Sequence, residues 1–220
     1  MTYSERADHR AEVVAKERPE LLIFCGAAGM IGSIVPLPAM VLGTLLAKHD
    51  FIADSLSDLG RGPHHIIMDT GFYVAAGGLL ALAIAAAHAH LDHFLWSLGI
   101  FCLALLALVV TLIGLWDEFG QDVDAGLSVH TKLTFFLGPL YLAGPLLMIQ
   151  GARRVSPVYP WLFGVSAVTW LVFATWFKFA PDDYDGVLEK VGIGATLLWT
   201  VPLSWLFLRR GLSERRRQAD

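Results

Sequence analysis

Charged residues are scarce in this sequence. Asp, Glu, Lys and Arg make up 16% of its 220 residues, whereas an average globular protein has about 25%. The mean hydropathy is +0.58, and the few charges lie near the chain ends and in short connections. This composition excludes a soluble globular chain. No connection between apolar segments is longer than about twenty residues. These short connections also exclude a large soluble catalytic domain.

Several sequence motifs that carry chemistry are absent. The chain has no GxxxxGK[ST] or GxGxxG nucleotide loop, no HExxH zinc motif and no GxSxG nucleophile turn. No basic stripe alternates with aromatic residues, so a nucleic-acid partner is not expected. No carboxylate lies in the middle of an apolar segment, which argues against a pump or an ion-coupled transporter.

Cysteine is also rare. Cys25 and Cys102 each lie inside an apolar segment, and no CxxC pair exists. We therefore expect two small buried hydrophobic side chains and no disulfide.

What the sequence has instead is six long apolar segments. Each contains 18 or more residues without Asp, Glu, Lys or Arg, and they span 21–47, 70–87, 94–116, 133–152, 155–177 and 191–208. At 1.5 Å per residue, each can cross a hydrocarbon layer of about 30 Å as a helix. The predicted fold is all-α, a polytopic bundle of six transmembrane helices. It forms one domain over residues 21–208.

The positive charges predict the orientation of this bundle. Eleven of the 16 basic residues lie in the N-terminal segment 1–20, in the pair Arg153–Arg154 and in the tail 209–220. By the positive-inside rule, both termini are expected in the cytoplasm and the protein in the plasma membrane. The segment 1–20 is predicted to be an amphipathic helix on the cytoplasmic surface. The basic tail is expected to contact anionic membrane lipids.

Small residues, prolines and aromatic residues suggest how the helices pack. Gly26, Gly29 and Gly32 form a stripe at which another helix can approach closely. Pro36 and Pro38 are expected to loosen the same helix, with or without a cavity beside the break. Residues at predicted segment ends are expected to form interfacial belts; they are Trp96, Trp116, Tyr159, Trp161 and Trp176.

Three polar clusters lie on the predicted outer side. The first, Ser55 to His65, contains Ser57, Asp58 and Arg61, and is either a simple turn or a pocket with metal ligands or an acid–base pair. The second runs from Asp117 to Lys132 and includes His130. It is either a solvated acidic loop or a cation site.

The third cluster, residues 182–190, contains Glu189 at the start of the last apolar segment. An ionisable side chain entering the bilayer indicates a functional site with a partner. The candidate partners are Lys132, Arg61 and His130. Lys190 points about 100° away on a helix and is a poor partner.

On the predicted inner side, His88, His90 and His93 lie within one short turn that also contains Asp92. They either form an ordinary connection or hold a transition metal such as zinc.

Three elements of the chain resemble a known family. Asp54-Ser-Leu-Ser-Asp-Leu-Gly60 is similar to the Ser-Asp-Leu-Gly signature of a bacterial and archaeal membrane family called domain of unknown function 998. Gly114 to His130 is similar to that family's acidic loop followed by a His. Gly186-Val-Leu-Glu-Lys190 is similar to its Gly-x-x-Glu-Arg element, with Lys in place of Arg. A more distant similarity is to the Frag1/DRAM/Sfk1 membrane proteins. The resemblance implies a six-helix fold and supplies no activity.

These elements all fall on the predicted outer side, so we expect them to converge in one polar site. Its candidate binding residues are Ser57, Asp58, Arg61, Asp117, His130, Glu189 and Lys190. His130 with Asp58 is a candidate zinc site, and the His88, His90 and His93 turn is a second one.

Three functions remain open at this point. The favoured one is binding or sensing of a lipid headgroup or a small polar ligand at the outer site, with membrane lipids as partners. The first alternative is a membrane-embedded, metal-dependent hydrolase that acts on a lipid, with Ser55 or Ser57 assisting. The second alternative is a structural membrane subunit.

Overall fold

The computed structural model describes residues 17–60, 64–116 and 129–219. These ranges form helices and contain no strand; the helices are α2 (Pro19–Ile34), α3 (Pro36–Ala47), α4 (Leu56–Leu59), α5 (His65–Ala89), α6 (Phe94–Trp116), α7 (Val129–Arg153), α8 (Val158–Phe177) and α9 (Asp185–Ala219).

Six segments are long and apolar enough to cross a membrane: α2 with α3, then α5, α6, α7, α8 and α9. The predicted all-α fold with six spans is therefore confirmed, and the chain is a multi-pass membrane protein. The helices extend beyond the apolar segments, because polar residues such as His65 and Asp185 already belong to the first turns. Helix α9 continues through the described part of the predicted tail 209–220, as far as Ala219. Residues 1–16 of the predicted N-terminal segment lie outside the described residues.

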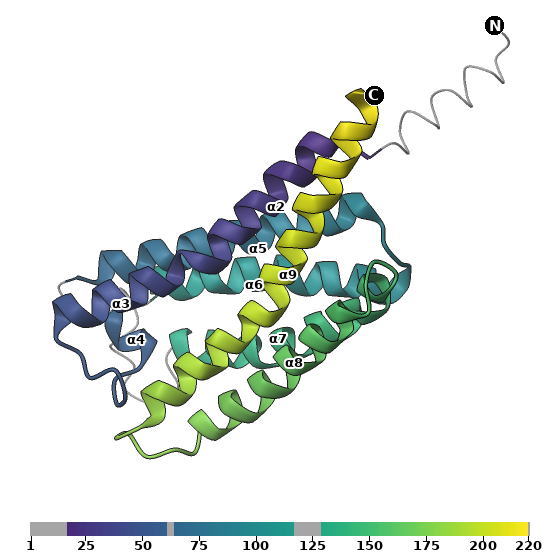
Figure 1. The fold of residues 1–220 in the computed structure, drawn as a ribbon. Coiled ribbons are helices and arrows are strands. Elements are labelled where there is room, and N and C mark those ends of the chain that lie inside the picture. The colour runs from purple at the N-terminus through teal and green to yellow at the C-terminus, as the bar shows by residue number, and fades with distance from the viewer. Residues whose placement is uncertain (1–16, 61–63, 117–128, 220) are drawn as a thin grey trace, which may run out of the picture.

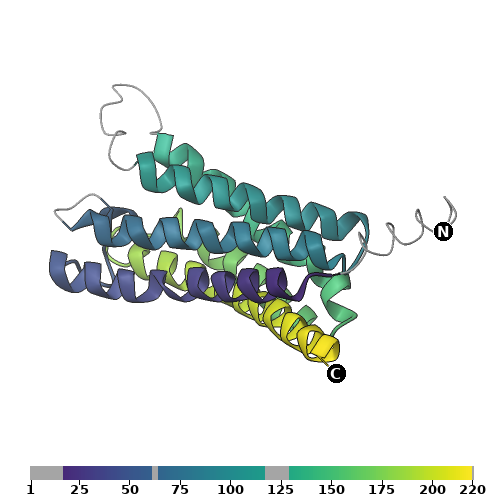
Figure 2. The ribbon, with the colours of Figure 1, turned by 90° about the horizontal axis from the view of Figure 1, so that it is seen from above.

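The six spans form a closed ring. Each packs on its neighbour in sequence, in the order α2, α5, α6, α7, α8 and α9, and α9 then packs on α2. Figure 1 shows α9 crossing diagonally beside α2, and Figure 2 shows the same bundle from above. We call the end of the bundle with α4 and the α8–α9 connection the α4 end. We call the opposite end, where α2 begins and α9 ends, the terminal end.

The glycine stripe on α2 closes this ring. A Cβ added at Gly26 would lie 2.6 Å from the backbone nitrogen of Leu208 in α9, and one added at Gly32 would lie 2.6 Å from the Cα of Gly78 in α5. Gly29 faces the side chains of Leu82 and Ser204. The prediction that this stripe is a packing face is confirmed.

The prolines interrupt the first span. Helix α2 ends at Ile34 and α3 begins at Pro36, while Val35 between them keeps helical angles of φ −58° and ψ −34°. Proline has no N–H and cannot continue the hydrogen-bond ladder. The predicted loosening is thus a break at Val35, and the chain still crosses as one segment.

The belt prediction holds only for some of the aromatic residues. Trp161 and Trp176 are 76% and 50% exposed, as expected for residues facing lipid. For Trp96 the prediction is wrong, because this side chain is 1% exposed. Its Nε1 donates to the carbonyl of Ala86 at 2.8 Å, and its ring packs against Gly151.

The two cysteines behave as predicted. Cys25 and Cys102 are buried and free.

Candidate functional site at the α4 end

The short helix α4 is formed by a capping box. Ser55 Oγ accepts the N–H of Asp58 at 3.3 Å, and Asp58 Oδ2 accepts the Ser55 N–H at 2.9 Å and its hydroxyl at 2.7 Å. This reciprocal pair satisfies donors that a helix start leaves unpaired. Residues 55–58 thus form a capped turn in which the Asp58 carboxylate accepts from Ser55, and the pocket alternative for Ser57 and Asp58 stays a prediction.

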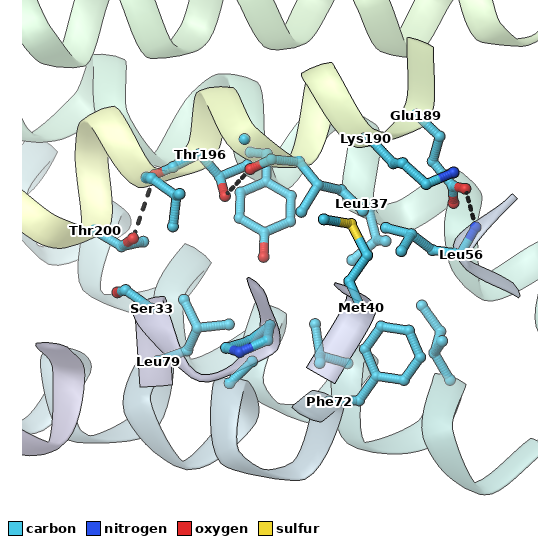
Figure 3. Close-up of a pocket in the computed structure, with 18 of the residues that line it drawn as sticks. Ser33, Met40, Leu56, Phe72, Leu79, Leu137, Glu189, Lys190, Thr196 and Thr200 are labelled. Carbon is cyan, nitrogen blue, oxygen red and sulfur yellow. Dashed lines mark hydrogen bonds between the residues drawn. The ribbon is translucent and has the colours of Figure 1, made fainter. Parts of the chain in front are cut away.

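Glu189 caps the same helix from outside. Its Oε2 accepts the N–H of Leu56 at 2.6 Å, although the two residues are 133 positions apart. Figure 3 shows this bond at one end of a pocket. The amide of Leu56 belongs to the first turn of α4, where no intrahelical acceptor exists. The hydrogen-bond partner of Glu189 is therefore a backbone amide. The partners expected from the sequence were only cationic and His side chains.

Lys190 holds the preceding loop. Its Nζ donates to the Asp54 carbonyl at 2.6 Å and to the Gly186 carbonyl at 3.3 Å, and it lies 5.0 Å from the centre of the Phe51 ring. The side chain is only 9% exposed. Within the described ranges Lys190 and Glu189 form no ion pair, in agreement with their predicted divergence.

The start of α9 fits closely against this loop. A Cβ at Gly186 would lie 2.2 Å from the Asp54 carbonyl oxygen. Val187 donates its N–H to the Ile52 carbonyl at 2.8 Å. The glycine of the Gly-x-x-Glu element thus permits the approach that lets Glu189 and Lys190 reach their partners.

His130, at the end of the family-like element Gly114 to His130, connects that element to the other two. It is 6% exposed, and its Nε2 shares a hydrogen bond of 2.9 Å with Ser57 Oγ. Helix α7 is thereby linked to α4, which is itself linked to α9. The structure brings Ser57, His130, Glu189 and Lys190 together around α4.

Two cavities meet at this cluster. The first is an inner chamber of about 140 Å³ lined by residues of all six spans. In Figure 3, Ser33 and Thr200 lie at one end of it, Glu189 and Lys190 at the other, and the Met40 side chain lies between. The chamber is thus apolar in the middle and polar at both ends.

The second cavity is a groove of about 710 Å³ between α7, α8 and the start of α9. Phe135 and Leu171 in its walls are 51% and 48% exposed, so the groove faces the surrounding lipid. Ser57, His130 and Glu189 line both cavities. The polar cluster therefore separates a lipid-facing groove from an inner chamber.

The remaining predicted residues fall into two groups. Asp58 lines the groove. Arg61 and Asp117 lie outside the described residues.

Two polar features were missed from the sequence. Lys178 lines the groove, with its Nζ 5.0 Å from the ring centres of Phe135 and Phe177. The sequence signal that could have indicated Lys178 is its position directly after the aromatic residues Trp176 and Phe177 at the end of α8. Asp69 is 7% exposed inside a span, and its Oδ2 lies 2.7 Å from His65 Nδ1. The i, i+4 spacing of His65 and Asp69 was the available signal there.

No metal centre is evident in the described part of the chain: no group of three or more His, Cys, Asp or Glu side chains there is arranged to hold an ion. His88 Nε2 accepts the Arg18 N–H at 2.7 Å, and His90 Nδ1 contacts the Ala87 carbonyl. Zinc at His130 and Asp58, or at His88, His90 and His93, stays a prediction.

Comparison with known proteins supports the family expected from the three elements. The model of the family described as protein of unknown function (DUF998) matches residues 30–206. No curated protein and no solved structure matches the chain, and the distant similarity to Frag1/DRAM/Sfk1 proteins stays a prediction. The matched range runs from the first span into the last and includes α4, His130, Glu189 and Lys190, and the chain accordingly belongs to the DUF998 family.

Proposed function

We propose that the protein binds a membrane lipid, with the polar headgroup at the α4 cluster and an acyl chain in the groove between α7 and α8. This proposal rests on the observation that an apolar groove leads directly to a polar cluster. A groove of about 710 Å³ with lipid-facing apolar walls ends on Ser57, Asp58, His130 and Glu189. A lipid presents the same order of apolar chain and polar head.

The side chains define the headgroup chemistry. Ser57 and the two carboxylates offer acceptors, which suit a headgroup with hydroxyl or amine donors. Lys178, which lines the same groove, offers a positive charge for a phosphate. The headgroup that fits best therefore carries both a phosphate and hydrogen-bond donors.

The inner chamber limits what passes the cluster. Its volume of about 140 Å³ is close to the roughly 150 Å³ of an engineered protein cavity that holds benzene. It accommodates part of a headgroup or a small polar ligand and not a whole lipid.

The proposal includes the orientation and the compartment. The basic residues at the terminal end favour a cytoplasmic location for that end. The α4 cluster then lies in the outer leaflet of the plasma membrane.

Two glycines allow a matched test of the groove. A Cβ at Gly138, which lines the groove, or at Gly164, which lines none of the cavities described here, would meet no atom within 4 Å. Gly138→Leu should place a side chain in the groove and lower labelling by a photoactivatable phospholipid. Gly164→Leu should be labelled like the wild type. Equal labelling of all three proteins, with unchanged co-purified lipid in mass spectrometry, would refute the proposal.

A hydrolase is the second candidate, and the hydrogen bond of 2.9 Å between Ser57 Oγ and His130 Nε2 favours it. A base in this position can take the Ser57 proton as the oxygen attacks an ester carbonyl, and can return it to the leaving alcohol. Water would then release the acyl group from Ser57. A fluorophosphonate probe tests this candidate. Modification mapped to Ser57 and absent in Ser57→Ala supports it, whereas no modification of Ser57 contradicts it.

The structural alternative has support from the same contacts. Glu189, Lys190 and His130 join three segments that are distant in sequence. It predicts that every substitution at the cluster lowers thermal stability, and that Gly138→Leu changes neither stability nor lipid content.

A further inference from the structure

A second groove lies at the terminal end, on the opposite side of the membrane from the α4 cluster. It has a volume of about 700 Å³ and runs between α8 and α9. Leu162 and Val201 line its deeper, apolar part, and Val158, Tyr159, Trp205 and Arg209 lie nearer the terminal end. Val158 and Trp205 are 58% and 48% exposed, so this groove also faces lipid.

Two adjacent arginines at this groove differ in their charge balance. Arg210 is neutralised by Glu17, with Nε–Oε2 at 2.8 Å and Nη2–Oε1 at 2.6 Å. Arg209 makes no ion pair with any residue in the described ranges. Its guanidinium lies 5.9 Å from the centre of the Trp205 ring, a cation–π arrangement that positions the group and leaves its charge unbalanced.

Most of the charged residues that follow on α9 are also basic. Arg215, Arg216 and Arg217 follow on the last turns of α9. Among the described residues, Arg217 is the one of these three that forms an ion pair, with Glu214 at 3.5 Å. Basic groups beside the membrane attract anionic lipids, and a basic pocket between helices can hold a phosphorylated headgroup.

We propose that this groove is a binding site for an anionic glycerophospholipid. The phosphate pairs with the Arg209 guanidinium beside Trp205, and an acyl chain lies along Leu162 and Val201. The Arg–phosphate pair supplies the selectivity for charge, because a guanidinium can donate two parallel hydrogen bonds to a phosphate. This site is independent of the function proposed for the α4 cluster.

The test measures thermal unfolding of the purified full chain in detergent with added dioleoylphosphatidylglycerol or dioleoylphosphatidylcholine. We expect phosphatidylglycerol to raise the wild-type Tm more than phosphatidylcholine does. Arg209→Gln should weaken the apparent affinity for phosphatidylglycerol about fivefold, the effect of one surface cation near an anionic lipid. Arg216→Gln removes the same charge from an exposed site outside the groove and should weaken this affinity less than Arg209→Gln does.

A second measurement keeps the proposal testable if Arg209→Gln is unstable. Phosphatidylglycerol brominated on its acyl chains should quench tryptophan fluorescence in the wild type, and Trp205→Phe should remove part of that quenching. Gly138→Leu should retain the response to phosphatidylglycerol. This result would distinguish binding at the groove between α8 and α9 from binding at the groove between α7 and α8. Equal responses to the two lipids, or unchanged responses in both Arg209→Gln and Trp205→Phe, would overturn the proposal.

Discussion

The backbone amide of Leu56 donates a hydrogen bond of 2.6 Å to the carboxylate of Glu189. An acid at the start of the last span thereby caps a four-residue helix that follows the first span. Such a short helix has little stability alone, because nucleation fixes several residues for one hydrogen bond. The position of Ser57 opposite His130 thus depends on α9.

Two substitutions at Glu189 should distinguish the contribution of its negative charge from that of its hydrogen-bond acceptor. Glu189→Gln keeps an oxygen for the Leu56 amide and should change stability by less than about 1 kcal/mol. Glu189→Ala leaves the amide without an acceptor and should destabilise the protein by about 1–3 kcal/mol. Thermal unfolding in detergent measures both. The exposed Asp183→Ala is the control, and an alanine variant as stable as this control would contradict the capping role.

The same substitution at two glycines of α9 should have opposite effects. At Gly186 a Cβ would lie 2.2 Å from the Asp54 carbonyl oxygen, whereas at Gly194 it would meet nothing within 4 Å. Gly186→Ala should destabilise by about 1–3 kcal/mol through overpacking. Gly194→Ala should be neutral or stabilise by up to about 1 kcal/mol, because alanine favours a helix. A Tm for Gly186→Ala at or above that of Gly194→Ala would show that the loop does not contact α9 in this way.

Trp96 should be far more sensitive than an exposed tryptophan. Trp96→Phe removes the Nε1–H that donates to Ala86 and should destabilise by about 1 kcal/mol, and Trp96→Ala by about 3–5 kcal/mol. Trp161→Phe at a side chain 76% exposed should have no measurable effect. Thermal unfolding compares the three variants. Equal Tm values for Trp96→Phe and Trp161→Phe would contradict the buried position.

The loop before α4 should loosen in acid. The N–H groups of Ile52 and then Ala53 donate to Asp50 Oδ1 at 2.7 and 3.3 Å, which holds the pKa of that carboxyl below its ordinary value. A depressed folded pKa gives stability that is present above the unfolded pKa of about 3.9 and is lost as the pH falls through the folded value.

Hydrogen exchange at the Ile52 and Ala53 amides, which donate to Asp50, measures this effect after correction for the intrinsic rate. Protection should be constant from neutral pH down to about 5 and should decrease below about 4. Asp50→Asn should remove this dependence. A wild-type protection that does not change with pH would contradict the prediction.

The fold could be predicted from the sequence because a membrane span must be long, apolar and internally hydrogen-bonded. The glycine stripe was equally readable, since Gly26 and Gly32 need a neighbouring backbone to explain their spacing. The prediction for Trp96 was wrong because the position of a residue along a span indicates its depth in the membrane. It does not indicate whether the side chain faces lipid or the interior of the bundle. The Trp96 ring is buried because it packs against Gly151, which is distant in sequence.

The site was only partly predictable. Three family-like elements on one side of the membrane indicated that Ser57, His130 and Glu189 could meet, and the structure brings them together. The partner of Glu189 could not be found from residue types, because every residue except proline carries a backbone amide. The groove depends on how α7, α8 and the start of α9 are arranged, and no local pattern in the sequence gives that arrangement.

The contact between α2 and α9 has a consequence for assembly. The ring closes through its first and last spans, so it cannot close until the final helix has left the ribosome and entered the bilayer. Until then the Gly26 face has no α9 backbone to meet, and the inner chamber lacks the wall that Glu189 to Thr200 supply. Completion of the inner chamber is therefore a late event in biogenesis, and a chain truncated before Asp185 lacks the α9 wall of that chamber.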